Sequence, residues 1–210
     1  MIYILSDKKV NGATNLPTLQ INFLKQTINF LSYDALIFTS KNALYALDKL
    51  YDNSWKTIPS YAIAPKTAQI INNLDGNLAF TGITNHGDLF AQELIPLLKN
   101  KKVLYLRGSK VVSSLVHRLN TNDIVCDEVV VYQSDCKIYK NKPTLPKNSI
   151  FIFSSPSTIE CFLKNFIWDD SFKAISIGKT TAKYFPSYIN YTISDTTSLE
   201  SCVKKALEIY

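Results

Sequence analysis

The sequence predicts an α/β protein made of two similar parallel-sheet domains, and two observations lead to that prediction. First, two motifs recur in the same order along the chain. Thr39 aligns with Ser154, 115 residues later, and Ala64 aligns with Gly178, 114 residues later. Motifs that keep their order and nearly their spacing indicate an internal duplication. Second, short apolar runs alternate with amphipathic stretches, which is typical of buried parallel strands connected by helices.

The first copy of the repeat predicts four strand–helix units. The expected strands are 34–38, 61–64, 77–81 and 102–106, and the expected helices are 41–51, 67–73, 88–100 and 111–120. In the first of these helices, Leu44 and Leu47 follow the spacing of a buried helical stripe. Ser40, Asp88 and Ser109 are the expected N-caps, because such side chains accept hydrogen bonds from free helical N–H groups.

The second copy is one strand short. It predicts strands at 149–153, 174–177 and 190–194 and helices at 157–165, 181–185 and 199–209. The missing strand would match residues 103–107, and the chain's own start, residues 2–6, has that apolar pattern. We therefore expect the N-terminal strand to complete the C-terminal domain.

This completion makes one domain discontinuous and the other an insertion. We expect the discontinuous domain at 1–18 and 136–210, the inserted domain at 24–128, and crossing linkers at 19–23 and 129–135. Both linkers contain apolar or alternating runs of the kind that form strands. Two parallel sheets joined in this way would leave a cleft between them.

Composition and charge restrict the class of protein. Of the 210 residues, 46% are hydrophobic and 19% charged, so the chain can bury a core. The formal net charge of +6 suits an anionic ligand, but the lysines are scattered, which argues against a nucleic-acid partner. The apolar start is too short for a signal peptide and no run approaches a membrane span. These features favour a cytoplasmic protein without a membrane partner.

The cysteines and histidines predict no metal site. The chain has four cysteines and no Cys-x-x-Cys pair, and its only histidines are His86 and His117. A zinc site needs such ligands clustered at short spacing. We expect Cys126, Cys136, Cys161 and Cys202 to be buried, reduced thiols of a cytosolic protein.

The turn Gly178-Lys179-Thr180 lies between an expected strand and an expected helix, like the end of a phosphate-binding P-loop. A P-loop needs another glycine five positions earlier, where this chain has Lys173. The repeat partner of the turn is 65–67, Pro-Lys-Thr, which cannot be a P-loop. The repeat therefore explains this turn better than nucleotide binding does.

Loops rich in hydroxyl groups follow the expected strands at 39–42, 65–67, 107–110, 154–157 and 178–181. In parallel sheets, ligands bind at the carboxyl ends of the strands, next to helix N-termini whose free N–H groups attract carboxylates and phosphates. The alternative is that these Ser and Thr residues only cap helices. The chain lacks the Gly-x-Ser-x-Gly, His-Glu-x-x-His and Cys–His patterns, so any mechanism must depend on positioning and hydrogen bonding.

Six stretches, in this order and spacing, resemble the uroporphyrinogen-III synthase family over nearly the whole chain. They are LIFTSKNALYAL, AIAPKTA, VLYLRGSK, DEVVVYQS, FIFSSPSTIECF and AISIGKTTAKYF. The resemblance implies two flavodoxin- or Rossmann-like parallel-sheet domains joined by a two-stranded linker, with the active-site cleft between them.

The resemblance also implies a reaction in tetrapyrrole and haem biosynthesis. Such an enzyme is a lyase that cyclises the linear tetrapyrrole hydroxymethylbilane to uroporphyrinogen III. Ring D is inverted through a spiro intermediate, and no metal or cofactor takes part. We expect this small molecule to be the partner of a cytoplasmic monomer.

By match to the family's motifs, Tyr132 is the expected catalytic residue, assisting departure of the substrate hydroxyl. The expected substrate-binding residues are Thr39, Ser40, Asn42, Thr67, Arg107, Gly108, Ser109, Ser154, Ser155, Ser157, Gly178, Thr180 and Thr181. The chain departs from the family at three places. Residues 6–8, Ser-Asp-Lys, stand where an arginine is frequent, residues 10–17 leave no room for a first helix, and Ala64 replaces a glycine.

Two other functions fit an α/β protein with such loops. One is a sugar-phosphate isomerase-like domain, which would need a Glu or His base in its site. The other is a non-catalytic, two-lobed binding protein for an anionic small molecule. Product formation from hydroxymethylbilane distinguishes all three.

Overall fold

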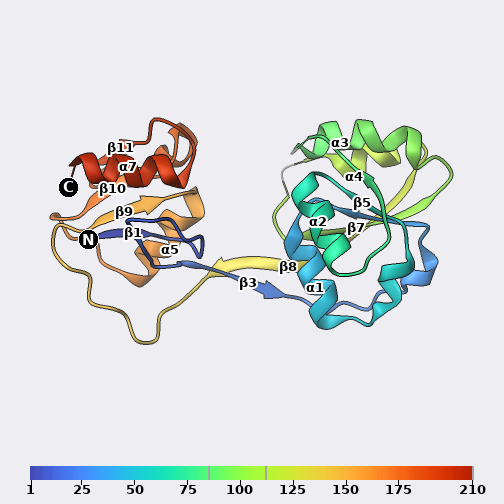
Figure 1. Ribbon diagram of the computed structural model, residues 1–210, viewed down its shortest axis with the longest axis horizontal. Helices are drawn as coiled ribbons and strands as arrows, with labels where there is room; N and C mark the ends of the chain where they lie inside the picture. The colour runs from blue at the N-terminus through green and yellow to red at the C-terminus, as the bar shows by residue number, and fades with distance from the viewer. Residues whose placement is uncertain (85, 112, 210) are drawn as a thin grey trace. The chain divides into compact units, whose positions relative to one another are not determined.

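The computed structural model of the chain describes residues 1–84, 86–111 and 113–209. It divides into two compact units, unit 1 (residues 1–20 and 135–210) and unit 2 (residues 21–134). Each unit has helices packed on a mainly parallel sheet (Figure 1), so the predicted class of two parallel-sheet α/β domains is confirmed. No helix in the described part of the chain is long and apolar enough to cross a membrane.

The sheet of unit 1 contains five strands in the order β11-β10-β9-β1-β2. The N-terminal strand pairs in parallel with β9, with Ile2 opposite Ile150, so it does lie in the sheet of the C-terminal segment. The strands are β1 Ile2–Ile4, β2 Thr14–Asn15, β9 Ile150–Phe153, β10 Lys173–Ser176 and β11 Tyr191–Ile193.

Both faces of this sheet are buried. Phe151 and Phe153 pack with α5, whereas Ile150 and Ile152 pack with α7 on the opposite face, because successive strand side chains point to opposite sides. A strand buried on both faces has no polar side, which explains its uninterrupted apolar sequence. The helices are α5 Pro156–Asn165, α6 Lys179–Ala182 and α7 Leu199–Ile209.

The connection from β1 to β2 contains no helix within its described residues, 5–13, in agreement with the shortness of this segment. The Asn15 side chain holds the connection by donating to the backbone carbonyls of Ser6 at 2.6 Å and Lys8 at 2.9 Å. The segment therefore returns to the sheet edge as a hydrogen-bonded loop.

The expectation of four reduced cysteines is wrong. Cys136, at the end of β8, and Cys161, in α5, form a disulfide with Cα atoms 5.0 Å apart. The fold brings them together over a separation of 25 residues, which no short-range spacing rule detects. Cys126 and Cys202 are free and buried, and burial raises the pKa of the Cys126 thiol to about 12.

The sheet of unit 2 contains six strands in the order β3-β8-β7-β4-β5-β6. The pairs from β8 to β6 are parallel. β3 runs antiparallel to β8, because Leu24 bonds to Val131 whereas Thr18 bonds to Lys137. The strands are β3 Leu19–Phe23, β4 Ala35–Phe38, β5 Ser60–Ala62, β6 Leu78–Thr81, β7 Lys102–Gly108 and β8 Val125–Cys136.

β3 and β8 contain the segments expected to cross between the domains. β8 is longer than its expected crossing segment because residues 125–128 already pair with β7. The division into linkers at 19–23 and 129–135, and the cleft between the domains, remain proposals about how the units are joined.

Helices also cover both faces of the unit 2 sheet. α1 and α2 pack on Leu36 and Phe38, and α3 and α4 pack on Ile37 and Tyr105. The elements are η1 Phe30–Ser32, α1 Lys41–Leu50, η2 Asn53–Thr57, α2 Pro65–Asn73, α3 Gly87–Leu94, η3 Ile95–Leu97 and α4 Leu115–Asn120 (Figure 1).

Two helices of unit 2 differ from the expectation. The helix expected at 88–100 ends at Leu94 and continues as a 3₁₀ turn that contains Pro96, because proline lacks the N–H that an α-helix needs. The helix expected at 111–120 begins only at Leu115. The loop before it is therefore longer, and residues 110, 111 and 113 are left to line a pocket.

Of the three expected N-caps, only Ser40 caps its helix, by accepting from the Asn42 N–H at 3.2 Å. Asp88 and Ser109 are not N-caps, because the N-caps are His86 for α3 and Ser114 for α4. The Asp88 carboxylate instead accepts from the N–H and hydroxyl of Ser114, at 2.8 and 2.7 Å. These bonds lower the pKa of Asp88 and tie the start of α4 to α3.

Candidate active site

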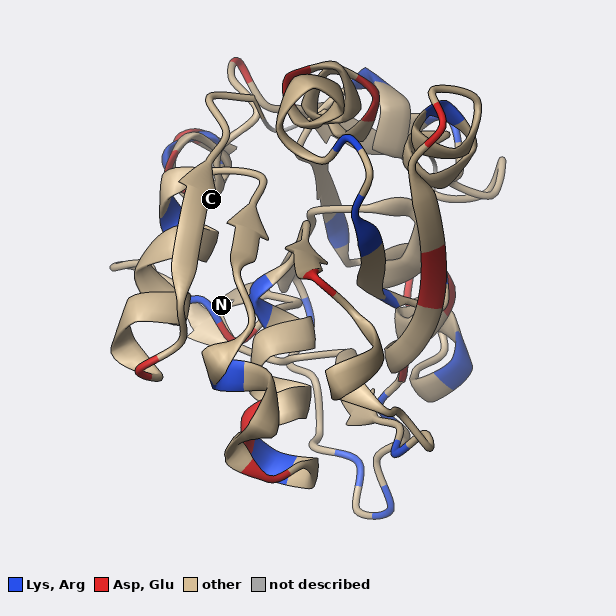
Figure 2. Ribbon diagram, turned by 90° about the vertical axis from the view of Figure 1, so that its right-hand side faces the viewer, with Lys and Arg blue, Asp and Glu red and all other residues tan. Residues whose placement is uncertain are grey.

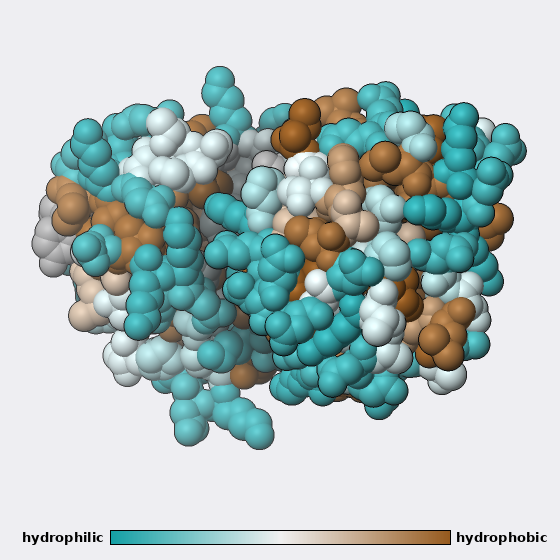
Figure 3. Space-filling model, turned by 45° about the vertical axis from the view of Figure 1, so that its right-hand side comes forward, coloured by the Kyte–Doolittle hydropathy of each residue, from teal (hydrophilic) through white to brown (hydrophobic). Residues whose placement is uncertain are grey.

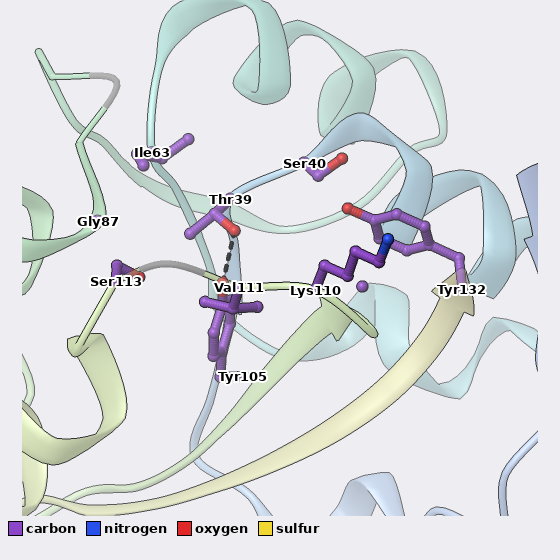
Figure 4. A pocket seen from close by; sticks show the side chains of 10 residues that line it. Thr39, Ser40, Ile63, Gly87, Tyr105, Lys110, Val111, Ser113 and Tyr132 are labelled. Carbon is purple, nitrogen blue, oxygen red and sulfur yellow. Dashed lines mark hydrogen bonds between the residues drawn. The ribbon is translucent and has the colours of Figure 1, made fainter. Parts of the chain in front are cut away.

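A pocket of about 210 Å³ lies in unit 2 at the carboxyl ends of the parallel strands (Figure 4). This is the edge at which parallel sheets bind ligands. Four residues expected from the sequence line it, namely Thr39, Ser40, Gly108 and Tyr132. The other described lining residues are Ile63, Gly87, Tyr105, Lys110, Val111 and Ser113.

Tyr132 is held against the backbone at Gly108. The two residues face each other across β7 and β8 where the register shifts, and the Ser109 N–H donates to the Tyr132 carbonyl at 3.0 Å. A Cβ at position 108 would lie 2.7 Å from the Tyr132 Cζ and 2.9 Å from its hydroxyl oxygen, which is closer than van der Waals contact allows. A side chain at position 108 would therefore displace the Tyr132 ring, and glycine leaves the space that the ring occupies.

Tyr105 also lines the pocket, although the sequence did not predict it as a binding residue. It lies in β7, is 2% exposed, and its hydroxyl is 2.7 Å from the Thr39 Oγ1. Burial raises the pKa of this phenol, so it stays protonated at neutral pH. Its place inside an apolar strand resembles that of a core residue, and the one sequence signal was a hydroxyl three positions before the expected Gly108.

Arg107 does not line this pocket. Its guanidinium forms a two-bond ion pair with Glu128, at 2.9 and 2.8 Å, and also donates to the carbonyls of Gly108 and Ser109. The hydrogen bonds with Glu128 raise the pKa of Arg107. This arrangement supports the loop that carries Gly108, and a contact between Arg107 and substrate stays a prediction.

Three further expected residues of unit 2 are not among the described residues lining the pocket. Asn42 lies in the first turn of α1, Thr67 is buried in the first turn of α2, and Ser109 follows β7. The turn before α2 also explains Ala64. Its φ of −158° is extended, a conformation that alanine adopts as readily as glycine, so this departure from the family leaves the turn intact.

The expected residues of unit 1 lie at the carboxyl ends of two adjacent strands, β9 and β10. Thr181 is buried, Thr180 is exposed, and the other four are half-buried: Ser154, Ser155, Ser157 and Gly178. The Ser155 backbone exchanges hydrogen bonds with the Thr158 hydroxyl, at 3.2 and 2.6 Å, which caps α5. Unit 1 thus brings its two expected loops to one sheet edge.

The surface charges are spread out. Lys and Arg residues are distributed over separate helices, strands and loops (Figure 2), and Lys110 is the charged residue among the described pocket lining. In Figure 4 its side chain extends towards Tyr132. Within residues 1–84, 86–111 and 113–209, no group of three His, Cys, Asp or Glu side chains is placed to hold a metal ion.

Known proteins share this architecture. The family model of uroporphyrinogen-III synthase HemD matches residues 11–204. The chain belongs to the uroporphyrinogen-III synthase family. The resemblance inferred from the six stretches is therefore confirmed, and the protein is placed among the enzymes of tetrapyrrole and haem biosynthesis.

One solved structure agrees with this assignment. The crystal structure of uroporphyrinogen-III synthetase from Helicobacter pylori 26695 matches with a TM-score of 0.79 and 31% identity, covering 100% of this chain and 99% of that chain. A mutant uroporphyrinogen III synthase from the extremely thermophilic bacterium Thermus thermophilus matches with a TM-score of 0.48 and 13% identity, covering 100% of this chain and 99% of that one. A search of curated proteins found no match.

Proposed function

We propose that the protein is a cyclising hydro-lyase that converts hydroxymethylbilane to uroporphyrinogen III, with inversion of ring D through a spiro intermediate. The observation that carries the proposal is the unit 2 pocket of a chain of this family, in which the Tyr132 phenol lies close to Gly108 and across from the Thr39 hydroxyl. The proposed enzyme is a cytoplasmic monomer that uses no cofactor and binds neither nucleic acid nor membrane.

The role of Tyr132 follows from the chemistry of the substrate. Loss of the hydroxyl group leaves a cation stabilised by the pyrrole rings. That cation attacks a substituted carbon of ring D, and the resulting spiro compound fragments and closes again. A phenol held in place can donate a hydrogen bond to the departing hydroxyl and then lie beside the cation. Such a donor acts without reorganisation because its position is set before the reaction.

The size of the pocket indicates what part of the substrate it holds. Its volume of about 210 Å³ lies below the roughly 300–1,000 Å³ of pockets for drug-sized ligands. A linear tetrapyrrole therefore does not fit in it whole, and we propose that it takes one pyrrole ring with its side arms. Thr39, Ser40, Asn42, Thr67, Arg107, Gly108 and Ser109, and in unit 1 Ser154, Ser155, Ser157, Gly178, Thr180 and Thr181, are proposed to bind the substrate and its carboxylates.

No observation favours a sugar-phosphate isomerase. Such an enzyme needs a general base in the site, and the described pocket lining contains no carboxylate or imidazole. On the face shown in Figure 3, hydrophobic residues form small groups among hydrophilic ones, so this face presents no large apolar patch of the kind that marks an interface.

The decisive experiment is turnover with isomer separation. Purified protein, with a chelator and without nucleotide, should convert hydroxymethylbilane mainly to the type III isomer. Spontaneous closure yields the type I isomer, so a product mixture equal to the protein-free control would overturn the enzymatic assignment. A non-catalytic binding protein would give that control result while still binding the substrate.

A further inference from the structure

A buried phenol in the pocket has no part in the mechanism proposed so far. Tyr105 lies in β7 with its Cα opposite Ile37, and its ring is enclosed by the core of unit 2. Only its hydroxyl end reaches the pocket, where it meets the Thr39 side chain (Figure 4). Thr39 follows β4 and is half-buried.

The direction of this hydrogen bond follows from the acidity and burial of the two groups. A phenol is a stronger donor than an aliphatic alcohol, and each hydroxyl has a single hydrogen. Thr39 is the partner found for the Tyr105 hydroxyl among the described residues, and a buried hydroxyl hydrogen without an acceptor is costly. Either oxygen could donate across this contact, and these two arguments favour Tyr105 as the donor and Thr39 as the acceptor.

This direction leaves the Thr39 hydrogen for the pocket. No described residue accepts it in the structure, and the surrounding lining offers Ser40, Lys110 and Ser113. Hydroxyl donors beside an ammonium group suit an anionic oxygen. The substrate class of the proposed function supplies such oxygens as the carboxylates on its pyrrole rings.

We infer that Tyr105 is a positioning residue: by donating to Thr39, it directs the Thr39 hydroxyl towards a carboxylate arm of the bound substrate. The inference rests on the proposed function, because it takes the substrate from it. Tyr105 itself does not touch the carboxylate. Because the Tyr105 hydroxyl donates to Thr39, the Thr39 hydroxyl hydrogen does not point back towards β7 and is directed into the pocket.

The test compares Tyr105→Phe, Thr39→Val and the double variant in kcat and KM for hydroxymethylbilane. A contact made equally in the ground and transition states changes KM and leaves kcat alone. We expect Thr39→Val to raise KM about tenfold, as for loss of one hydrogen bond to a charged group. Tyr105→Phe should raise it about threefold to tenfold, because the hydroxyl of Thr39 remains but loses its orientation.

If Tyr105 only stabilised the fold, the KM effects of Tyr105→Phe and Thr39→Val would multiply in the double variant. A positioning residue predicts that they do not. The double variant should have the KM of Thr39→Val alone, since Tyr105 acts only through Thr39. Thr39→Ser should recover most of the affinity lost in Thr39→Val. The matched control is Tyr61→Phe, a phenol of the same core that is 5% exposed, pairs with Lys101 at 3.2 Å and lies outside the pocket. It should leave KM unchanged.

Each outcome decides between the alternatives. If the wild type forms type III product and Tyr105→Phe keeps the wild-type KM, or if the two single effects multiply in the double variant, Tyr105 is not a positioning residue and the proposed function still stands. If the wild type forms no type III product, both fail. Should Tyr105→Phe not fold, Thr39→Val and Thr39→Ser decide, and equal KM values for these two would overturn the inference.

Discussion

At the scale of single residues, the pocket contains one pair in close contact, Gly108 and Tyr132. Gly108 has no side chain, and the Tyr132 ring occupies the space that a Cβ there would take. The sequence analysis selected both residues from family motifs, without any sign that they touch. Their contact makes Gly108 a residue that leaves room for the proposed catalytic phenol, and substitutions at either position test it.

Gly108→Ala should push the Tyr132 ring out of its place. We expect turnover to fall by at least about tenfold and the free energy of unfolding to drop by roughly 1–3 kcal/mol, as in overpacked sites. Steady-state kinetics and urea unfolding measure the two effects. In a Tyr132→Ala background the clash is absent, so adding Gly108→Ala should cost no further stability, and turnover should stay low. A Gly108→Ala protein with wild-type stability and turnover would contradict this account.

Tyr132→Phe keeps the ring against Gly108 and removes only the donor. Deleting one positioned donor costs roughly 10²–10³ in rate, and we expect the low end because the substrate loses its hydroxyl fairly readily unaided. The melting temperature should stay nearly unchanged and the product should remain type III. Wild-type turnover would make Tyr132 a structural residue, and an unfolded variant would show that its hydroxyl is a structural bond.

At the scale of elements, α7 follows its own sequence pattern, whereas a residue distant in the sequence decides where α4 starts. α7 begins and ends at the expected residues, Leu199 and Ile209, because its apolar stripe is unbroken over this range and marks the helix in the sequence. α4 starts at Leu115 because Asp88, in another helix, binds the N–H of Ser114. A pattern along α4 alone cannot contain that information.

The disulfide is the clearest of these element-level contacts, since it fastens the end of β8 to α5. A cross-link that closes a loop of 25 residues stabilises a protein by about 3.5 kcal/mol, mainly by restricting the unfolded chain. Adding a reductant should lower the free energy of unfolding by about this amount, as measured in urea. It should have no effect on a Cys136→Ala/Cys161→Ala variant.

Counting thiols provides an independent check of the disulfide. The denatured chain should show two reactive thiols, from Cys126 and Cys202, before reduction and all four of its cysteines afterwards. Four reactive thiols without reductant would mean that Cys136 and Cys161 are reduced, as a cytosolic thiol pool would favour.

At the scale of the whole molecule, the chain order and the units do not coincide. Unit 2 is continuous, with a core around Phe38 and Trp55, whereas the sheet of unit 1 needs β1 from the other end of the chain. β1 lies between β9 and β2, so removing it exposes the apolar edge of β9 and leaves its backbone groups unpaired.

Fragments should show this asymmetry. Residues 21–134 alone should unfold cooperatively in urea, because they carry their own core. Residues 135–210 alone should show no cooperative transition, and adding a peptide of residues 1–20 should restore one. Cooperative unfolding of 135–210 without the peptide would mean that β1 is dispensable for unit 1.

The sequence by itself determined the repeat, the alternation of strands and helices, the N-terminal strand in the sheet of unit 1, and the family. These features follow from local periodicity and from the order of the motifs. Strands buried on both faces of a parallel sheet must be apolar throughout, and such apolar runs are visible in the sequence. Four pocket residues, Thr39, Ser40, Gly108 and Tyr132, could be named for the same reason, since they follow strands directly or match a family motif.

Only the tertiary structure decided which side chains meet. Tyr105 and Thr39 are 66 positions apart, Asp88 and Ser114 are 26 apart, and Cys136 and Cys161 are 25 apart. Each pair is joined by the register of a sheet or the packing of helices, not by spacing along one element. A strand tyrosine has the same sequence signature whether its hydroxyl meets a core carbonyl or the floor of a pocket. The position of its partner in space makes Tyr105 part of the site.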